Sequence, residues 1–199
     1  MKRLPVALLL TASITAGCSA ANEPSPSPTS TATPAPSAAA PAGKRRPVVL
    51  DAKKLVLAVD DMTTNDLTFG ETDAATAKRE LDERLGSVAV ERDFTASDCG
   101  AGPQRSLTYG GLSVYFLDDK LAGWSVRSDD TSGLTTATGI SLASTREQVQ
   151  DVYDGKVKVF ESSLGTEWTA PDGISGLFKD DSPDAVVATF WSGTTCIAR

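Results

Sequence analysis

Two segments of the chain place apolar residues at the spacing of one helix face. Leu81 and Leu85 lie four positions apart in residues 74–85, and Val149 and Tyr153 do so in residues 145–153. This spacing predicts two amphipathic helices. Residues that can cap a helix flank both segments: Thr72 or Asp73 and Gly86 for the first, Ser144 or Thr145 and Gly155 for the second.

Alternating apolar and polar residues follow each predicted helix. The alternation predicts antiparallel strands at residues 87–94, 112–117 and 121–126 after the first helix, and at 156–162, 174–178 and 185–191 after the second. The residues Asp118-Asp119-Lys120 predict a tight hairpin turn, and residues 180–184 a longer one. An opening strand is expected at residues 54–59.

The two segments also resemble each other residue by residue. Gly111–Asp119 and Gly173–Asp181 are identical at five of nine positions, including a Phe and a final Asp-Asp. Such self-similarity predicts a duplicated unit. We therefore expect an α+β fold of two tandem repeats, each a helix packed on antiparallel strands. The repeats should occupy about residues 55–130 and 139–197 of a domain spanning 47–199.

The start of the chain has the features of an export signal. Lys2 and Arg3 precede a mostly apolar stretch at residues 4–14, which is too short to span a bilayer as a helix. The stretch ends in Ile14-Thr15-Ala16-Gly17-Cys18, which resembles the bacterial lipobox. The resemblance implies a signal peptide at residues 1–17, cleavage between Gly17 and Cys18, and lipid on the Cys18 sulfur. The alternative is an ordinary signal peptide with a chance cysteine.

Residues 18–46 fit a membrane tether. After Cys18 they are nearly all Ser, Pro, Thr and Ala, with six prolines and no aromatic or large aliphatic residue. Such a segment has too little apolar area to offset the entropy of ordering, so we expect a disordered linker that ends in the basic residues Lys44–Arg46. These features predict a protein held by its lipid on the extracytoplasmic side of the cell membrane.

Three cysteines occur, and Cys18 is assigned to the lipid. The other two, Cys99 and Cys196, are expected to pair, because cysteines left over in an exported protein usually form disulfides. Two free thiols are the alternative. The chain contains no histidine and no Cys-x-x-Cys, so a zinc site is not expected.

Two further motifs resemble known families. Gly139–Val149 reads Gly-Ile-x-Leu-x-x-Thr-Arg-x-x-Val, and Trp191–Cys196 reads Trp-x-Gly-x-x-Cys. The first resembles the repeat opening of small secreted and lipoprotein modules, including the β-lactamase-inhibitor protein and SmpA-type lipoproteins, although Ala143 replaces their usual Gly. The second is similar to the end of uncharacterised actinobacterial lipoproteins. The resemblance covers most of residues 55–197 and implies the duplicated fold, and no functional residue carries over by position.

The net charge of −7 is unevenly distributed. Lys2, Arg3 and Lys44–Arg46 precede residue 47, opposed by Glu23 alone, so residues 47–199 contain 14 basic and 25 acidic residues and carry −11. An acidic domain repels nucleic acid. We therefore expect no nucleic-acid partner, and a partner that is neutral or basic where it meets the domain.

Most catalytic chemistry is excluded by composition. Without histidine, Ser-His-Asp and Cys-His sites cannot form, and no nucleotide-binding fingerprint is present. We interpret the adjacent acids as turn residues, because neighbours in a strand point to opposite faces and suit calcium poorly. These pairs are Asp60-Asp61, Asp118-Asp119, Asp129-Asp130 and Asp180-Asp181. No cofactor or metal is expected.

The hypothesis that fits these features is a non-enzymatic binding or interaction module on the cell envelope, with an envelope protein or a glycan as its partner. Tyr109, Trp124, Trp168 and Trp191 either pack in the core or form the binding surface, and the sequence favours neither face. The alternative function is a carboxylate-based enzyme acting on cell-wall glycan, which only the abundance of acids supports.

Overall fold

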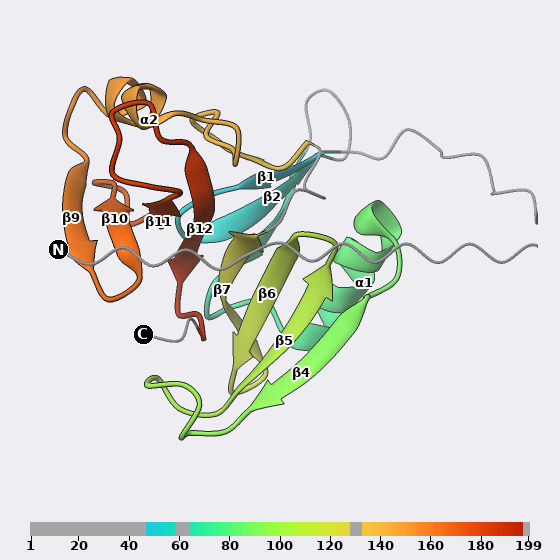
Figure 1. The fold of residues 1–199 in the computed structure, drawn as a ribbon. Helices are drawn as coiled ribbons and strands as arrows, with labels where there is room; N and C mark the ends of the chain where they lie inside the picture. The colour runs from blue at the N-terminus through green and yellow to red at the C-terminus, as the bar shows by residue number, and fades with distance from the viewer. Residues whose placement is uncertain (1–46, 59–63, 128–132, 197–199) are drawn as a thin grey trace, which may run out of the picture. The chain divides into compact units, whose positions relative to one another are not determined.

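The structure, a computed structural model, describes residues 47–58, 64–127 and 133–196. These residues form an α+β fold of two helices and twelve strands, the predicted fold class (Figure 1). They belong to one compact unit, Pro41–Arg199. No helix among them is both long and apolar enough to cross a membrane. The predicted signal peptide, linker and lipid site, including Gly17 and Cys18, lie outside the described residues.

Eight strands form an antiparallel sheet whose order is mirrored about its centre. The order is β4-β5-β6-β7-β12-β11-β10-β9, so each half contains four strands that are consecutive in sequence, and β7 pairs with β12 in the middle. The strands are β4 (Val90–Phe94), β5 (Gln104–Tyr109), β6 (Leu112–Leu117), β7 (Lys120–Arg127), β9 (Lys158–Ser162), β10 (Gly165–Thr169), β11 (Ser175–Phe178) and β12 (Val187–Gly193).

Four short strands form a second, mixed sheet in the order β3-β2-β1-β8. They are β1 (Val48–Leu50), β2 (Lys54–Ala58), β3 (Thr64–Thr68) and β8 (Thr135–Thr136). β1 pairs antiparallel with β2 and parallel with β8. The predicted opening strand is therefore β2, and β8 links the second half of the chain to the first strand of the domain.

Both helices begin where the sequence predicts. α1 spans Ala74–Leu85, and Asp73 caps it by accepting a hydrogen bond from the backbone N–H of Thr76 at 2.8 Å. α2 spans Arg146–Val152, and Thr145 caps it in a capping box with Gln148. These side chains satisfy backbone N–H groups that have no partner within the helix.

The two helices end differently, which corrects the prediction for Gly155. Gly86 follows the last residue of α1 and adopts a φ of 90°. The C-cap of α2 is Tyr153, two residues before Gly155, and Asp154 already has a φ of 53°. Only the first of the two predicted glycine caps is therefore correct.

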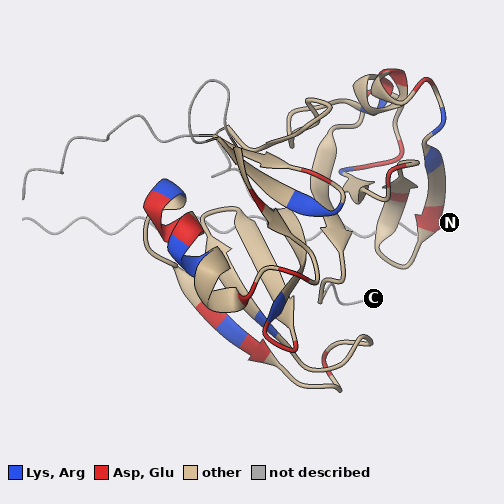
Figure 2. Cartoon of the chain, turned by 180° about the vertical axis from the view of Figure 1, so that it is seen from behind, with Lys and Arg blue, Asp and Glu red and all other residues tan. Residues whose placement is uncertain are grey.

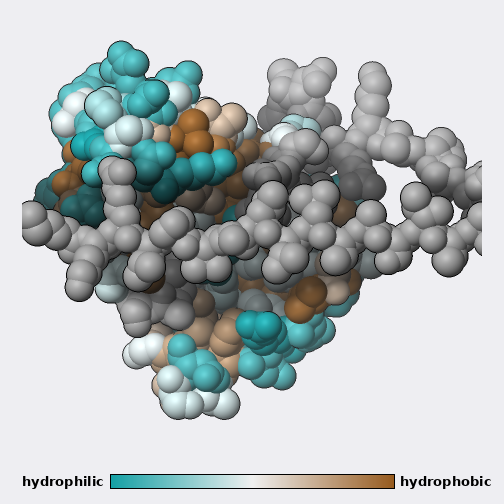
Figure 3. Space-filling view, viewed as in Figure 1, coloured by the Kyte–Doolittle hydropathy of each residue, from teal (hydrophilic) through white to brown (hydrophobic). Residues whose placement is uncertain are grey.

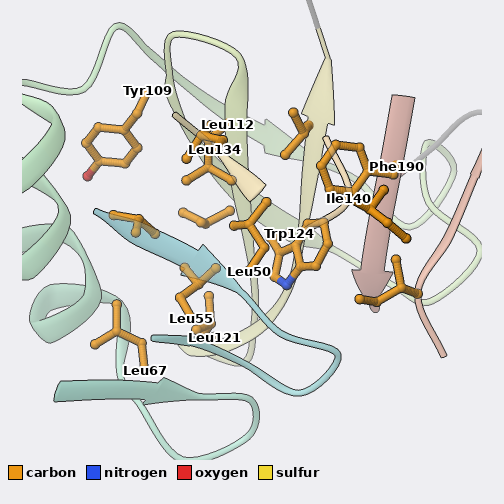
Figure 4. Close-up of a cluster of buried hydrophobic side chains, with 14 of the residues drawn as sticks. Leu50, Leu55, Leu67, Tyr109, Leu112, Leu121, Trp124, Leu134, Ile140 and Phe190 are labelled. Carbon is orange, nitrogen blue, oxygen red and sulfur yellow. The ribbon is translucent and has the colours of Figure 1, made fainter. Parts of the chain in front are cut away.

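The core lies between the two sheets and α1 (Figure 4). Leu50, Leu55 and Leu67 of the four-stranded sheet belong to the same buried cluster as Leu112 and Leu121 of the eight-stranded sheet. Leu134 and Ile140, from the segment between the two halves, complete it. A single apolar cluster therefore holds both sheets together.

Three of the four aromatic residues considered as a binding surface belong to this core. The indole N–H of Trp124 donates to the backbone oxygen of Asp51 at 2.8 Å. Trp168 stacks on Phe178 with ring centroids 6.1 Å apart, and Tyr109 is buried against α1. The interpretation as a surface patch is thus corrected for Tyr109, Trp124 and Trp168, because each points to the apolar side of the sheet.

The two halves make corresponding backbone contacts. Each half ties the start of its helix to its last two strands through two bonds: Leu121 N to Thr72 O and Ala74 N to Asp119 O in the first, Val187 N to Ser144 O and Arg146 N to Ala185 O in the second. Phe116 and Phe178 are both buried in the third strand of their half, and each adjoins a shift in strand register. The repeated sequence therefore occupies repeated positions.

Candidate functional site

The face of the eight-stranded sheet opposite the core is the candidate site. Directly paired residues of antiparallel strands share a face, so the register defines it. We call the following residues the groove face: Val90, Thr108, Ser113, Ser125, Trp191, Ser175, Thr169 and Lys158 in a row across all eight strands, Arg92, Ser106, Tyr115, Gly123 and Gly193 on one side of that row, and Arg127, Thr189, Leu177, Glu167 and Phe160 on the other.

A groove of about 1060 Å³ lies on this face. Its lining comes from both halves of the sheet, with Arg92, Thr108 and Tyr115 from the first and Leu177 and Thr189 from the second. The groove thus spans the junction between β7 and β12, and its volume is in the range of ligand-binding clefts.

The disulfide forms part of the groove wall. Cys99, in the loop between β4 and β5, is bonded to Cys196, which follows β12, with Cα atoms 5.2 Å apart. The predicted pairing is therefore confirmed. Cys196 lines the groove directly. The bond fixes the end of β12 in the second half to a loop of the first.

A glycine lets the chain after β12 reach this position. Thr194 donates its backbone N–H to Ala122 at 2.8 Å, which brings residue 194 over Gly123. A Cβ atom on Gly123 would lie 2.7 Å from the backbone oxygen of Thr194, closer than real Cβ contacts. The close approach therefore requires glycine at this position.

An arginine and two aromatic rings form a continuous strip in the first half of the groove. The guanidinium of Arg92 lies 5.6 Å from the ring centroid of Phe94, and the rings of Phe94 and Tyr115 are 6.4 Å apart. The hydroxyl of Tyr115 shares a hydrogen bond with Ser125 at 3.1 Å. This strip offers a cation, aromatic surface and hydroxyl groups to a ligand.

Hydroxyl groups form the central row of the groove face. Thr108 and Ser113 share a hydrogen bond of 2.9 Å in the first half, and Thr169 and Ser175 share one of 3.0 Å in the second. Ser125 lies between these pairs. Each hydroxyl can donate and accept, so the row can bind a ligand rich in polar groups.

The charge of the groove face differs from that of the domain. Its charged residues are Arg92, Arg127, Lys158 and Glu167, which gives +2 on a domain of −11, and the carboxylates of Asp93 and Asp98 also line the groove. Within the described part of the chain, neither arginine forms an ion pair. Figure 2 shows charged residues of both signs on α1, away from the groove face.

The Asp98 carboxyl beside the groove stays ionised at neutral pH. Asp98 lines it and accepts hydrogen bonds from the hydroxyl and the backbone N–H of Thr95, which hold the pKa of that carboxyl below its ordinary value. Every described carboxyl with a shifted pKa is shifted in this direction: Asp73, Glu80, Asp82, Asp98 and Asp180. Such groups are poor general acids at neutral pH.

Exposed apolar side chains flank the groove face at both edges of the sheet. Val90 on β4 is 51% exposed and Phe160 on β9 is 46% exposed, and the only other large apolar side chain exposed among the described residues is Val152 of α2. Figure 3 views this side of the molecule. On the part of the surface that the grey residues leave visible, small hydrophobic areas lie among hydrophilic ones. The outer borders of the groove face are thus the exception to an otherwise polar surface.

The remaining predicted residues divide between this site and turns. Trp191 lies on the groove face, opposite to its core-facing neighbour Phe190, and is 7% exposed. Its role in binding stays a prediction. Asp118 and Asp119 form the turn between β6 and β7, with φ of 50° and 61°, which confirms their interpretation as turn residues.

Of the other acidic pairs, the structure describes Asp180-Asp181 alone. Asp180 accepts a hydrogen bond from the backbone N–H of Ser182, as in a turn. The pairs Asp60-Asp61 and Asp129-Asp130 lie outside the described residues. Among those that are described, no group of three or more potential metal-ligating side chains occurs.

Comparison of the chain with protein-family models, with curated proteins and with solved structures finds no match.

Proposed function

We propose that the chain is an exported lipoprotein whose domain, residues 47–199, is a non-enzymatic module that binds an envelope partner on its groove face. One observation carries the proposal: the sheet face away from the core contains a groove of about 1060 Å³, lined by two arginines that form no ion pair with another described residue, and it has exposed apolar residues at its borders. Such a combination is typical of recognition surfaces.

The location rests on the cysteines. A Cys99–Cys196 disulfide supports an oxidising, extracytoplasmic environment. Cys18 is proposed as the lipid anchor on the strength of its lipobox, and Cys18→Ala should then abolish metabolic labelling with fatty acid. Continued labelling of the variant would refute the lipid anchor and would leave the proposed binding role of the groove face unaffected.

The two halves are proposed to be tandem repeats of one ancestral unit. The mirrored strand order, the corresponding helix-to-hairpin bonds and the identical residues of Gly111–Asp119 and Gly173–Asp181 support this origin. The relation to the β-lactamase-inhibitor and SmpA-type modules stays a prediction.

The alternative, a carboxylate-based glycan enzyme, has less support. Glycoside hydrolysis needs two carboxyl groups, one of them with a raised pKa. Asp93 and Asp98 line the groove and Glu167 lies on the groove face, but the shifted carboxyl groups of the described residues all have lowered pKa values. Binding requires neither feature.

The test is cross-linking of the intact lipoprotein in cells. Thr108→Trp and Leu177→Trp each place a bulky neutral side chain in the groove, and Ala137→Trp places one on the exposed turn after β8 as a control. Partner recovery should fall with the two groove variants and stay unchanged with the control. Recovery equal to that of a chain truncated after Arg46 would show that the domain does not bind.

A further inference from the structure

We propose that the groove face binds an anionic polysaccharide, whose carboxylate or phosphate groups are held by Arg92 and Arg127. This inference rests on the proposed function and deepens it by naming the chemistry of the partner. It replaces the expectation of a neutral or basic partner, which followed from the charge of the whole domain.

Charge is the first argument. Six arginines lie in the described residues, and Arg79, Arg84 and Arg105 form ion pairs. Two of the other three, Arg92 and Arg127, line the groove. A guanidinium matches carboxylate and phosphate geometry, and one left without a carboxylate on an acidic domain favours an anion from a ligand.

The spacing of the arginines favours an extended ligand with sparse charge. Arg92, Ser106, Tyr115 and Gly123 are direct cross-strand neighbours on four adjacent strands, so Gly123 lies three strands from Arg92. Arg127 follows Gly123 by four residues on the same strand. At ordinary strand spacing the Cα atoms of the two arginines lie roughly 20 Å apart along the sheet. A single small anion cannot reach both residues. Nucleic acid, with a phosphate about every 1.7 Å of duplex, would be repelled by the rest of the domain.

The surface between the arginines favours a glycan over a polypeptide. Its partly exposed hydroxyl groups are those of Thr108 and Ser113, and serine is depleted at protein–protein interfaces. Hydroxyl groups that both donate and accept suit the hydroxyl groups of sugars. The partly exposed ring of Phe94, which packs on the buried ring of Tyr115, adds a surface against which the apolar face of a sugar ring can pack.

The experiment measures binding of defined oligosaccharides to the full-length lipoprotein in detergent by calorimetry. The probes are an oligogalacturonate of about ten sugars, its methyl ester, a phosphorylated mannan oligosaccharide and polyglutamate, since guanidinium groups bind carboxylate and phosphate alike. At least one of the two anionic glycans should bind, with the methyl ester and polyglutamate weaker. Arg92→Gln and Arg127→Gln should each weaken binding about tenfold, because each removes charge-assisted hydrogen bonds.

Arg79→Gln is the matched control, because Arg79 is an exposed arginine on α1, away from the groove face. It should leave affinity unchanged, and melting curves check that all variants fold. Equal binding of the methyl ester, tighter binding of polyglutamate, failure of both anionic glycans, or unchanged affinity in the two groove variants would each overturn the inference. If Thr108→Trp still abolishes partner recovery in cells, the proposed function survives that failure.

Discussion

At the scale of single residues, the two halves differ most where Trp168 enters the core. Its partner across the strands is Gly176, and a Cβ on Gly176 would lie 2.6 Å from the Cε2 atom of Trp168 and 2.6 Å from the oxygen of Thr189. The corresponding position of the first half is Val114, which faces the smaller Leu107. A large residue and a glycine in one half thus replace two medium residues in the other.

We expect Gly176→Ala to destabilise the protein by about 1–3 kcal/mol, the usual range for overpacking a core. Gly100→Ala serves as the control, because a Cβ there meets no atom within 4 Å and the backbone needs no positive φ. Urea unfolding of both variants measures the difference. A Gly176→Ala protein as stable as Gly100→Ala would show that the Trp168 site has free space.

The cap of α1 gives a pH-dependent prediction. A hydrogen bond from the backbone N–H of Thr76 lowers the pKa of Asp73 below its ordinary value. A carboxyl group with a lower pKa in the folded state stabilises above its unfolded pKa of about 4, and this stabilisation is lost as pH falls through the folded value. Asp73→Ala should therefore melt at a lower temperature than the unmodified protein at pH 7, and the gap should shrink below pH 4.

Melting temperatures measured between pH 7 and pH 2 check this expectation. Glu83→Ala, which removes an exposed carboxylate from the last turn of the same helix, is the control for helix propensity and net charge. A gap that is constant with pH would mean that the Asp73 carboxylate does not act as a charged cap.

Residue-level errors in the sequence interpretation arise from register. The corresponding backbone bonds of Leu121 and Val187 align Trp124 with Phe190 and not with Trp191. A shift of one residue reverses the face of a strand. Because the turn before β12 is longer than the one before β7, the sequence could not show that Trp191 faces the groove and Trp124 the core.

At the scale of elements, the disulfide links two segments that are not paired as strands. It connects the β4–β5 loop to the end of β12, closing a loop of 97 residues. We expect Cys99→Ala/Cys196→Ala to lose about 2–5 kcal/mol of unfolding free energy. Urea unfolding with and without reductant measures this. Reductant should destabilise the unmodified protein and leave the double variant unchanged, and a response of the double variant would point to another cause.

Elements with strong local signals were predictable, and those that depend on distant partners were not. The bounds of α1 follow from its cap and its apolar spacing, which act within a few residues. β5 and β10 escaped prediction because their sequences, Gln104–Tyr109 and Gly165–Thr169, are mostly polar, and both lie between two neighbours in the sheet. Their conformation is set by pairing on both sides. Arg92 and Tyr115 of the candidate site were unpredictable for the same reason, because only the assembled sheet brings them together.

At the scale of the whole molecule, the two halves share one core. β7 pairs with β12 from Gly123 to Arg127, and the rings of Trp124 and Phe190 meet edge to face with centroids 5.6 Å apart. β8, which precedes the second half, pairs with β1 at the start of the domain. The sequence predicted two repeats but carried no signal for these long-range pairings.

This sharing predicts that neither half folds alone. Without residues 133–199, the first half loses β8, exposes the core-facing side of Trp124, and leaves β7 as an unpaired edge. Without residues 47–127, the second half loses the strand that pairs with β12 and the leucines that cover it.

Circular dichroism of each half expressed separately should show no cooperative thermal transition, because a fragment of this size with an incomplete core has too little buried area to offset its chain entropy. Mixing the two halves should restore the transition, since the missing surfaces are supplied by the partner. A first half that melts cooperatively at the temperature of the intact domain would mean that the β7–β12 junction joins two independently stable units.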